Sequence, residues 1–143
     1  MIVPDANLLL YAYDTTSPFH EKARPWWETC LSGSEPVGLT HPTVFAFVRL
    51  GTSARVFASP MTLGEASSHV TSWLARGVTR VIEPADDHVR RVLELLSAAG
   101  SAGGNLVTDA QIAAIALTHR AVVHTADSDF RRFPELRCHY PLE

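Results

Sequence analysis

The chain has 143 residues, which is the size of one globular domain. Hydrophobic residues make up 46% and charged residues 19% of it, a balance that excludes a disordered tail, a collagen-like repeat and a low-complexity linker. The formal net charge of −3 provides no global positive field for nucleic acid, so any nucleic-acid contact must use a local basic patch or a bound cation.

Apolar runs in the chain are short. None is longer than six residues, the length of Leu8 to Tyr13, whereas a membrane helix needs about 20. No basic segment precedes Leu8 to Tyr13, so it does not resemble a signal peptide, and we expect a cytoplasmic protein without a membrane partner. Cys30 and Cys138 lie far apart and form no CxxC motif, which favours two isolated thiols and leaves a disulfide between them as the alternative.

Strands and helices alternate through the first half of the chain. Asp5 ends a first strand and stands where the N-cap of a helix would be, and Pro25 predicts a kink or break in the following helix. Thr62 is a predicted N-cap. The predicted elements are a strand at 1–4, helices at 6–13 and 18–31, a strand at 37–40, and helices beginning at 41 and after 62.

The alternation continues in the second half. A strand at 78–82 precedes an amphipathic helix at 86–99, whose apolar positions are Val89, Val92, Leu93 and Leu96. After a glycine-rich connector, Asn105 is predicted to cap a helix that runs to about 119, and strands follow at 121–125 and 136–140. This order predicts one α/β domain over 1–143, with a mostly parallel central sheet flanked by helices on both faces.

Three carboxylates fall at corresponding places in this pattern. Asp5 and Asp127 each follow the carboxyl end of a predicted strand, and Asp109 lies early in the helix after Asn105. Ligands of open α/β sheets bind beyond the carboxyl ends of the strands, so Asp5 and Asp127 would meet there if their strands are neighbours. Asp109 shares a helix face with apolar residues, where an unpaired charge is costly. The pattern therefore predicts an acidic metal site.

Each carboxylate also has an ordinary structural interpretation. Asp5 could be only a helix N-cap, and Asp109 could be only a carboxylate favoured by the helix dipole. Asp127 and Asp129 could form an Asx turn. These interpretations become less probable together, because all of the residues are predicted to lie at one edge of one sheet.

Three motifs carry a resemblance to a known family. Asp5-Ala-Asn7 follows the opening strand, Asn105-Leu-Val-Thr-Asp109 opens an alanine-rich helix, and Thr125-Ala-Asp-Ser-Asp-Phe130 lies near the end. In their order and spacing these motifs resemble those of the PIN-domain nucleases. The size of the chain and its start, VPDANLLLYA, are similar to those of the VapC-type toxins of bacterial toxin–antitoxin pairs.

The resemblance implies a Mg²⁺- or Mn²⁺-dependent endoribonuclease toxin that a VapB-type antitoxin neutralises, and it implies a homodimer. It also implies that Asp5, Asp109 and Asp127 are the catalytic metal ligands. Asn7 and Thr125 match positions that orient a ligand carboxylate. Asp129 matches a position that holds a metal-bound water, with a structural turn as its alternative role.

One position departs from the family pattern. Family members commonly carry a glutamate on the helix after the second strand, where this chain has Ala46. Mg²⁺ usually keeps several waters and needs only one or two protein carboxylates, so one cation can still bind. We expect weaker binding of the metal without substrate, and the remaining carboxylates are enough for one cation but marginal for two.

Local positive charge for RNA is expected near the acidic edge. The candidates are Arg49, Arg55, Arg131 and Arg132, with a solvated surface role as the alternative for the last two. His20 and His124 are expected in core or surface packing, with contact to RNA as the alternative. Trp26, Trp27 and Trp73 lie on amphipathic helix faces, which indicates core or dimer-interface packing.

Two rival functions remain at this point. A PIN-like RNA-binding or protein-interaction module without hydrolysis is compatible with the missing glutamate. A receiver-type signalling domain also clusters aspartates at strand ends, but it needs a phosphoacceptor aspartate after a central strand and a late lysine. The only lysine is Lys22, and no aspartate follows the strand at 37–40, which disfavours a receiver domain.

Overall fold

A parallel sheet organises the protein, whose computed structural model describes residues 1–100, 104 and 106–143. Its strand order is β3-β2-β1-β4-β5, and every pairing is parallel. The strands are β1 (Ile2–Pro4), β2 (Val37–Leu39), β3 (Thr79–Val81), β4 (Val122–His124) and β5 (Cys138–His139). The predicted α/β class with a parallel sheet is therefore confirmed.

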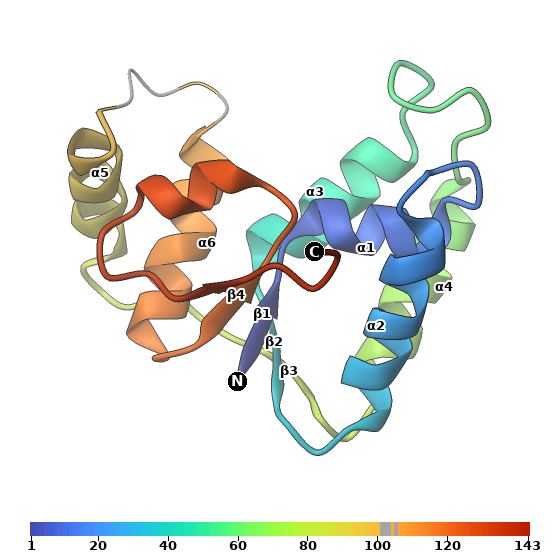
Figure 1. Ribbon diagram of the computed structural model, residues 1–143, viewed down its shortest axis with the longest axis horizontal. Helices are drawn as coiled ribbons and strands as arrows, with labels where there is room; N and C mark the ends of the chain where they lie inside the picture. The colour runs from blue at the N-terminus through green and yellow to red at the C-terminus, as the bar shows by residue number, and fades with distance from the viewer. Residues whose placement is uncertain (101–103, 105) are drawn as a thin grey trace.

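Helices cover both faces of this sheet. In Figure 1, α1, α2 and α4 lie on one side of the strands and α5 and α6 lie on the other. The helices are α1 (Ala6–Tyr13), α2 (His20–Ser32), α3 (His41–Gly51), α4 (Leu63–Leu74), α5 (His88–Ala98), α6 (Leu106–Thr118) and the short 3₁₀ helix η1 (Ser128–Arg132). No helix in this described part of the chain is long and apolar enough to cross a membrane.

Two hydrophobic cores lie on the two faces of the sheet. Because successive strand residues point to opposite faces, Ile2 packs with α1, α2 and α4, whereas Val3 packs with α6. Trp27 and Trp73 are both buried in the first core, where their rings meet edge to face at 5.5 Å. The predicted core role of these two tryptophans is confirmed.

Helix α2 differs from its prediction. It begins at His20 and continues through Pro25 to Ser32 without a break. Pro25 removes one backbone hydrogen-bond donor from the helix. The buried residues Ala23, before it, and Trp27 and Cys30, after it, pack into the core, and this packing stabilises the helix on both sides of the proline. Cys30 and Cys138 are free thiols, as expected. The predicted cap Asn105 lies outside the described residues.

The predicted apolar face of α5 is partly wrong. Val92 is buried, but Val89 is 73% exposed and Leu93 is 61% exposed. The helix instead packs on α6 through Val92, Leu95, Leu96 and Ala99, which recur at i, i+3, i+4 and i+7. The two overlapping apolar stripes of this sequence cannot be told apart by periodicity alone, and only one of them is covered.

Candidate active site

Asp5 lies at the carboxyl edge of the sheet, directly after β1. β1 and β4 are neighbours, with Pro4 opposite His124, and the backbone N–H of Asp5 donates to the carbonyl of His124 over 2.9 Å. Asp5 and Asp127 were expected to meet if their strands are neighbours, and the strands are neighbours. The hydrogen bonds between β1 and β4 place Asp5 beside the segment that contains Thr125 and Asp127.

A hydroxyl group joins the two segments. Thr125 is fully buried, and its Oγ1 donates to Asp5 Oδ2 over 2.9 Å. The same Oγ1 accepts the backbone N–H of Asp127 over 2.9 Å. Asp127 Oδ1 in turn accepts the backbone N–H of Asp129 over 2.8 Å. Thr125 and two of the three predicted ligands, Asp5 and Asp127, thus belong to one hydrogen-bonded chain that continues to Asp129.

Burial makes the carboxyl group of Asp5 a weaker acid. Asp5 is 4% exposed, and its pKa rises from 3.8 to about 6, first because of desolvation. The Thr125 hydroxyl and the N–H groups of Ala6 and Asn7 lower this pKa, and the charge of Asp127 raises it. Burial dominates, so ionising Asp5 costs more than it does in water, and a bound cation would offset that cost.

Asp109 belongs to the same electrostatic cluster. It lies half-buried in the first turn of α6, and its pKa rises to about 7. Desolvation is the main cause, and the negative charges of Asp5, Asp127 and Asp129 add to it. α6 therefore brings Asp109 to the edge where the other three carboxylates lie.

The ordinary structural interpretations fare differently. Asp5 occupies the N-cap position of α1, where the N–H groups of Ala6 and Asn7 lower its pKa, but no capping hydrogen bond of regular geometry joins its side chain to the helix. A carboxylate stabilised by a helix dipole has a lowered pKa, whereas that of Asp109 is raised. Asp127 does cap η1, so the turn at Asp127 and Asp129 is present. That turn still leaves Asp127 Oδ2 outside the capping bond.

Helix α3 starts beside the end of β1. Thr40 caps it by accepting the N–H of Thr43, and the Thr43 hydroxyl donates to the carbonyl of Pro4 over 3.0 Å. Ala46, the position of the missing glutamate, follows one turn later and is buried. Asn7, half-buried, lies in the first turn of α1, two residues after Asp5. Both helices therefore present their first turns at the carboxyl edge.

The candidate RNA-binding arginines are exposed, and two of them have partners within the protein. Arg131 lies 4.2 Å over the ring of Tyr140 and forms an ion pair with Glu143 at 3.5 Å. Arg132 donates to the carbonyl of Ala99 and lies 3.7 Å from Asp129 Oδ1. Arg49 lies near the end of α3 and is exposed.

The donor chemistry fits a hard divalent cation. The clustered side chains are carboxylates, whose oxygens Mg²⁺ and Mn²⁺ prefer, and burial followed by the neighbouring negative charges raises the pKa values of Asp5 and Asp109. Within residues 1–100, 104 and 106–143, no three His, Cys, Asp or Glu side chains lie close enough together to hold a metal ion.

Two tyrosines lie at the site that were not predicted from the sequence, Tyr140 and Tyr11. The Tyr140 hydroxyl donates to the carbonyl of Asp127 over 3.2 Å, and its ring comes from beyond β5. Tyr11 lies one helical turn after Asn7, and its pKa is raised by burial and then by the charges of Asp5 and Asp127. The i, i+4 spacing from Asn7 could have identified Tyr11, but no local signal identifies Tyr140.

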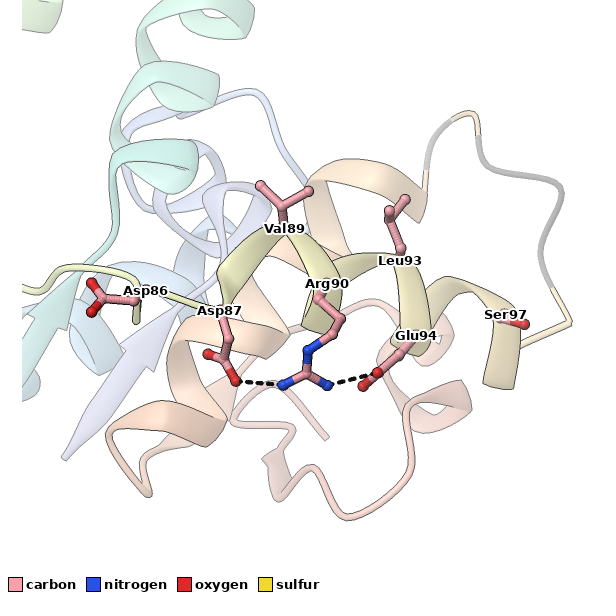
Figure 2. A pocket seen from close by; sticks show the side chains of 7 residues that line it. All are labelled: Asp86, Asp87, Val89, Arg90, Leu93, Glu94 and Ser97. Carbon is pink, nitrogen blue, oxygen red and sulfur yellow. Dashed lines mark hydrogen bonds and ion pairs between the residues drawn. The ribbon is translucent and has the colours of Figure 1, made fainter.

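A surface hollow of about 630 Å³ lies on α5, apart from this site. Figure 2 shows Arg90 between Asp87 and Glu94, while Val89 and Leu93 point away from the side on which Arg90 lies. The ion pairs of Arg90 with Asp87 and Glu94 measure 3.0 and 2.7 Å. These ion pairs are exposed and of the i, i+3 and i, i+4 kind, which contribute little to stability. The hollow holds no part of the acidic cluster.

Known proteins match the whole chain. A family model for the PIN domain matches residues 2–136. The sequence is 40% identical to Ribonuclease VapC33 of Mycobacterium tuberculosis over 142 residues, which covers 99% of both chains. It is 39% identical to Ribonuclease VapC37 of the same organism, covering 99% of this chain and 97% of the relative.

Solved structures share the fold at low sequence identity. VapC20 of Mycobacterium tuberculosis, described as a Sarcin-Ricin loop cleaving toxin, matches with a TM-score of 0.70 and 18% identity, over 96% of this chain and 99% of that one. VapBC2 from Rickettsia felis, bound to a DNA fragment from its promoter, matches with a TM-score of 0.68 and 19% identity, over 97% and 98%. These matches support the fold alone.

Proposed function

Because this chain belongs to the PIN-domain family, we propose that it is an endoribonuclease, the toxin of a VapC-type toxin–antitoxin pair that a VapB-type antitoxin neutralises. The observation that carries the proposal is the buried Asp5, which the Thr125 hydroxyl links to Asp127. The pKa of Asp109 is raised at the same edge, partly by the charges of Asp5 and Asp127. Perturbed carboxylates in such a cluster are typical of catalytic sites. The PIN match also removes the receiver-domain alternative.

Asp5, Asp109 and Asp127 would hold a divalent cation, Mg²⁺ or Mn²⁺, in the proposed site. When bound, the cation supplies Lewis-acid chemistry that acidifies water and offsets charge on the phosphoryl oxygens. Thr125 fixes the orientation of the Asp5 carboxylate, and Asn7 stands two residues away as a second orienting group. Ala46 adds no charge, which favours one cation over two.

The protein residues have separate tasks in hydrolysis. The backbone N–H of Asp129 donates to Asp127 Oδ1, which keeps Asp129 next to Asp127. From that position its carboxylate can orient the attacking water. Asp109, whose pKa is raised to about 7 in the metal-free protein, would be held ionised by the bound cation and so serve as a ligand. Arg49, Arg131 and Arg132 would supply local positive charge to RNA, which requires the last two to exchange their present acidic partners for phosphates.

The remaining proposals concern assembly and location. We propose that residues 1–143 act as one nuclease domain in the cytoplasm, where RNA is available. A homodimer is supported by the uncovered apolar stripe of α5, where Val89 and Leu93 lie one turn apart (Figure 2). The antitoxin partner is supported by the VapC relatives and by neighbours that are toxin–antitoxin complexes.

Purified protein tests the reaction directly. We expect cleavage of single-stranded RNA with Mg²⁺ or Mn²⁺, none with EDTA, and products that carry a 5′-phosphate because water is the nucleophile. Cyclic 2′,3′-phosphate ends, or full activity after chelation, would contradict the metal mechanism. Tight RNA binding without cleavage under any divalent cation would support the rival function, a PIN-like module that lacks hydrolysis.

A further inference from the structure

A small cavity opens beside the acidic cluster. It has a volume of about 180 Å³ and is formed by separate segments of the chain. α1 contributes Tyr11, and the residue before α2 is Phe19, while the segments after β4 and β5 supply the remaining wall. The wall residues in those segments include Thr125, Tyr140, Leu142 and Glu143.

The cavity shares side chains with the candidate active site. Thr125, which donates to Asp5, forms part of its wall. Tyr140, another wall residue, donates from its hydroxyl to the carbonyl of Asp127. A group in the cavity therefore contacts side chains that hydrogen-bond directly to Asp5 and Asp127. A group bound there would be directly connected to a phosphodiester held at Asp5 and Asp127.

Aromatic rings dominate the wall chemistry. Tyr11 and Phe19 lie with ring centroids 4.9 Å apart, and Phe19 remains 45% exposed although it is apolar. Arg131 already covers the ring of Tyr140, at 4.2 Å. An exposed ring beside a nuclease site offers a flat apolar face of the kind on which unstacked bases of single-stranded RNA are held.

The polar groups at the cavity select a base over a phosphate. Glu143 contributes a carboxylate, which accepts hydrogen bonds from amino groups and repels phosphate oxygens. Arg131 is paired with Glu143, so its charge is partly offset. Lys22 donates to the carbonyl of Leu142 over 3.2 Å and so holds this wall segment against α2. The cavity is also smaller than the ~300 Å³ of typical drug-sized sites, which suits one base.

We propose that this cavity binds one unstacked base of the RNA substrate next to the scissile phosphodiester. Phe19 and Tyr11 provide the stacking surface, and Glu143 accepts a hydrogen bond from an exocyclic amino group of the base. The cavity would then determine base preference at one position relative to the cut. This inference rests on the proposed ribonuclease function.

Substitutions at Phe19 separate stacking from simple burial. Phe19→Leu keeps an apolar side chain without a π face, and Phe19→Trp keeps the π face. Phe45→Leu is the matched control: Phe45 is 64% exposed and stacks on His41, which pairs with Glu83 just beyond β3, the outermost strand on the side of the sheet away from β5. The probes are single-stranded RNA 12-mers of randomised sequence, with cleavage products sequenced and RNA affinity measured by fluorescence anisotropy.

We expect Phe19→Leu to weaken RNA affinity about 5- to 150-fold and to flatten the base preference at one position. Phe19→Trp should restore both, and Phe45→Leu should change neither. Glu143→Gln should reduce discrimination between amino-bearing bases and uracil at the same position. Mn²⁺ affinity, measured by calorimetry, should stay unchanged in these variants, because none of them removes a carboxylate of the metal site.

The possible failures are distinguishable. Wild-type protein that cleaves no RNA with Mg²⁺ or Mn²⁺ overturns the proposed function. Unaltered RNA affinity and base preference in Phe19→Leu overturn the base cavity, whether or not the wild type cleaves. If Phe19→Leu binds and cleaves RNA normally but escapes inhibition by the co-expressed antitoxin, the cavity is a protein-docking site and the proposal is wrong.

Discussion

Thr125 and Asp5 are 120 residues apart in the chain, and their side chains are joined by a 2.9 Å hydrogen bond in the buried edge of the sheet. The same Thr125 hydroxyl accepts the N–H of Asp127, so it uses its donor and one acceptor to hold the ends of β1 and β4 in fixed relation. A buried hydroxyl with both functions satisfied orients one carboxylate and the backbone of another.

Removing this hydroxyl should damage the site more than the fold. Thr125→Val keeps the shape of the side chain but leaves the Asp127 N–H and Asp5 Oδ2 without their partner. We expect metal affinity or cleavage to fall about 10- to 100-fold. Thr125→Ser, which restores the hydroxyl, should recover most of the activity. Equal activity in Thr125→Val and the wild type, by initial rates of cleavage, would contradict an orienting role.

Neutralising the perturbed carboxylates should abolish cleavage without destabilising the metal-free protein. The folded-state pKa of Asp5 is raised to about 6, and ionising a group with a raised pKa costs stability of about 1.4 kcal/mol per pKa unit. We therefore expect Asp5→Asn and Asp109→Asn to melt at an equal or higher temperature than the wild type at pH 8, by calorimetry without metal.

The exposed residue Asp86 provides the control for these variants. Asp86→Asn should retain cleavage and show the wild-type melting temperature. Mg²⁺ should raise the melting temperature of the wild type and of Asp86→Asn by linkage, and it should lose most of this effect in Asp5→Asn and Asp109→Asn. Clear destabilisation with cleavage retained would reduce Asp5 and Asp109 to ordinary helix-start residues.

The same carboxylates set the dependence on pH. Their folded pKa values, about 6 for Asp5 and about 7 for Asp109, lie above the ordinary value of 3.8, so the folded state binds more protons between pH 4 and pH 7. The contribution of these groups to metal-free stability should therefore grow as the pH falls from 8 to about 4. Denaturant titrations of the wild type and Asp109→Asn across this range isolate the effect, which should shrink in the variant.

Metal binding should respond to pH in the opposite direction. Protons compete with the cation for Asp5 and Asp109, so Mg²⁺ affinity and cleavage should fall as the pH drops below about 7. Calorimetric titration with Mn²⁺ at pH 6 and pH 8 measures this. Affinity that does not change between these two pH values would place the cation elsewhere.

Ala46→Glu should restore the acidic residue that this helix lacks. Ala46 is buried one turn after Thr43, whose hydroxyl bonds the carbonyl before Asp5. We expect Ala46→Glu to tighten Mn²⁺ binding in the absence of RNA and to lower metal-free stability, because it adds a buried charge. Ala46→Gln, similar in size but neutral, should lower stability without tightening Mn²⁺ binding. Equal Mn²⁺ affinities would mean that position 46 does not face the site.

The uncovered stripe of α5 predicts the state of association. Val89→Lys with Leu93→Lys should convert a homodimer into a monomer, measured by light scattering after size-exclusion chromatography, because it charges an exposed apolar surface. Val56→Lys, at a residue that is 50% exposed elsewhere, is the control. A double variant that remains dimeric would assign the interface to another face.

The sequence by itself determined the class of fold, and it predicted the chemistry of the site. Short apolar strands between helices require a parallel sheet, since each connection must cross over one face. Asp5 and Asp127 were expected near carboxyl ends of strands, because Asp5 directly follows the apolar run 1–4 and Asp127 follows the predicted strand at 121–125. Carboxylates without a histidine or cysteine set indicated a hard cation. These conclusions need only local periodicity and residue type.

The tertiary structure alone decided which of these segments meet. The strand order places β4 beside β1, and Pro4 lies opposite His124, which no local pattern encodes. It also decided which apolar stripe of α5 is covered, and that Tyr140 and Phe19 approach the acidic edge from distant segments. The physical reason is that burial, and with it the raised pKa of Asp5 and Asp109, depends on contacts between residues far apart in the chain.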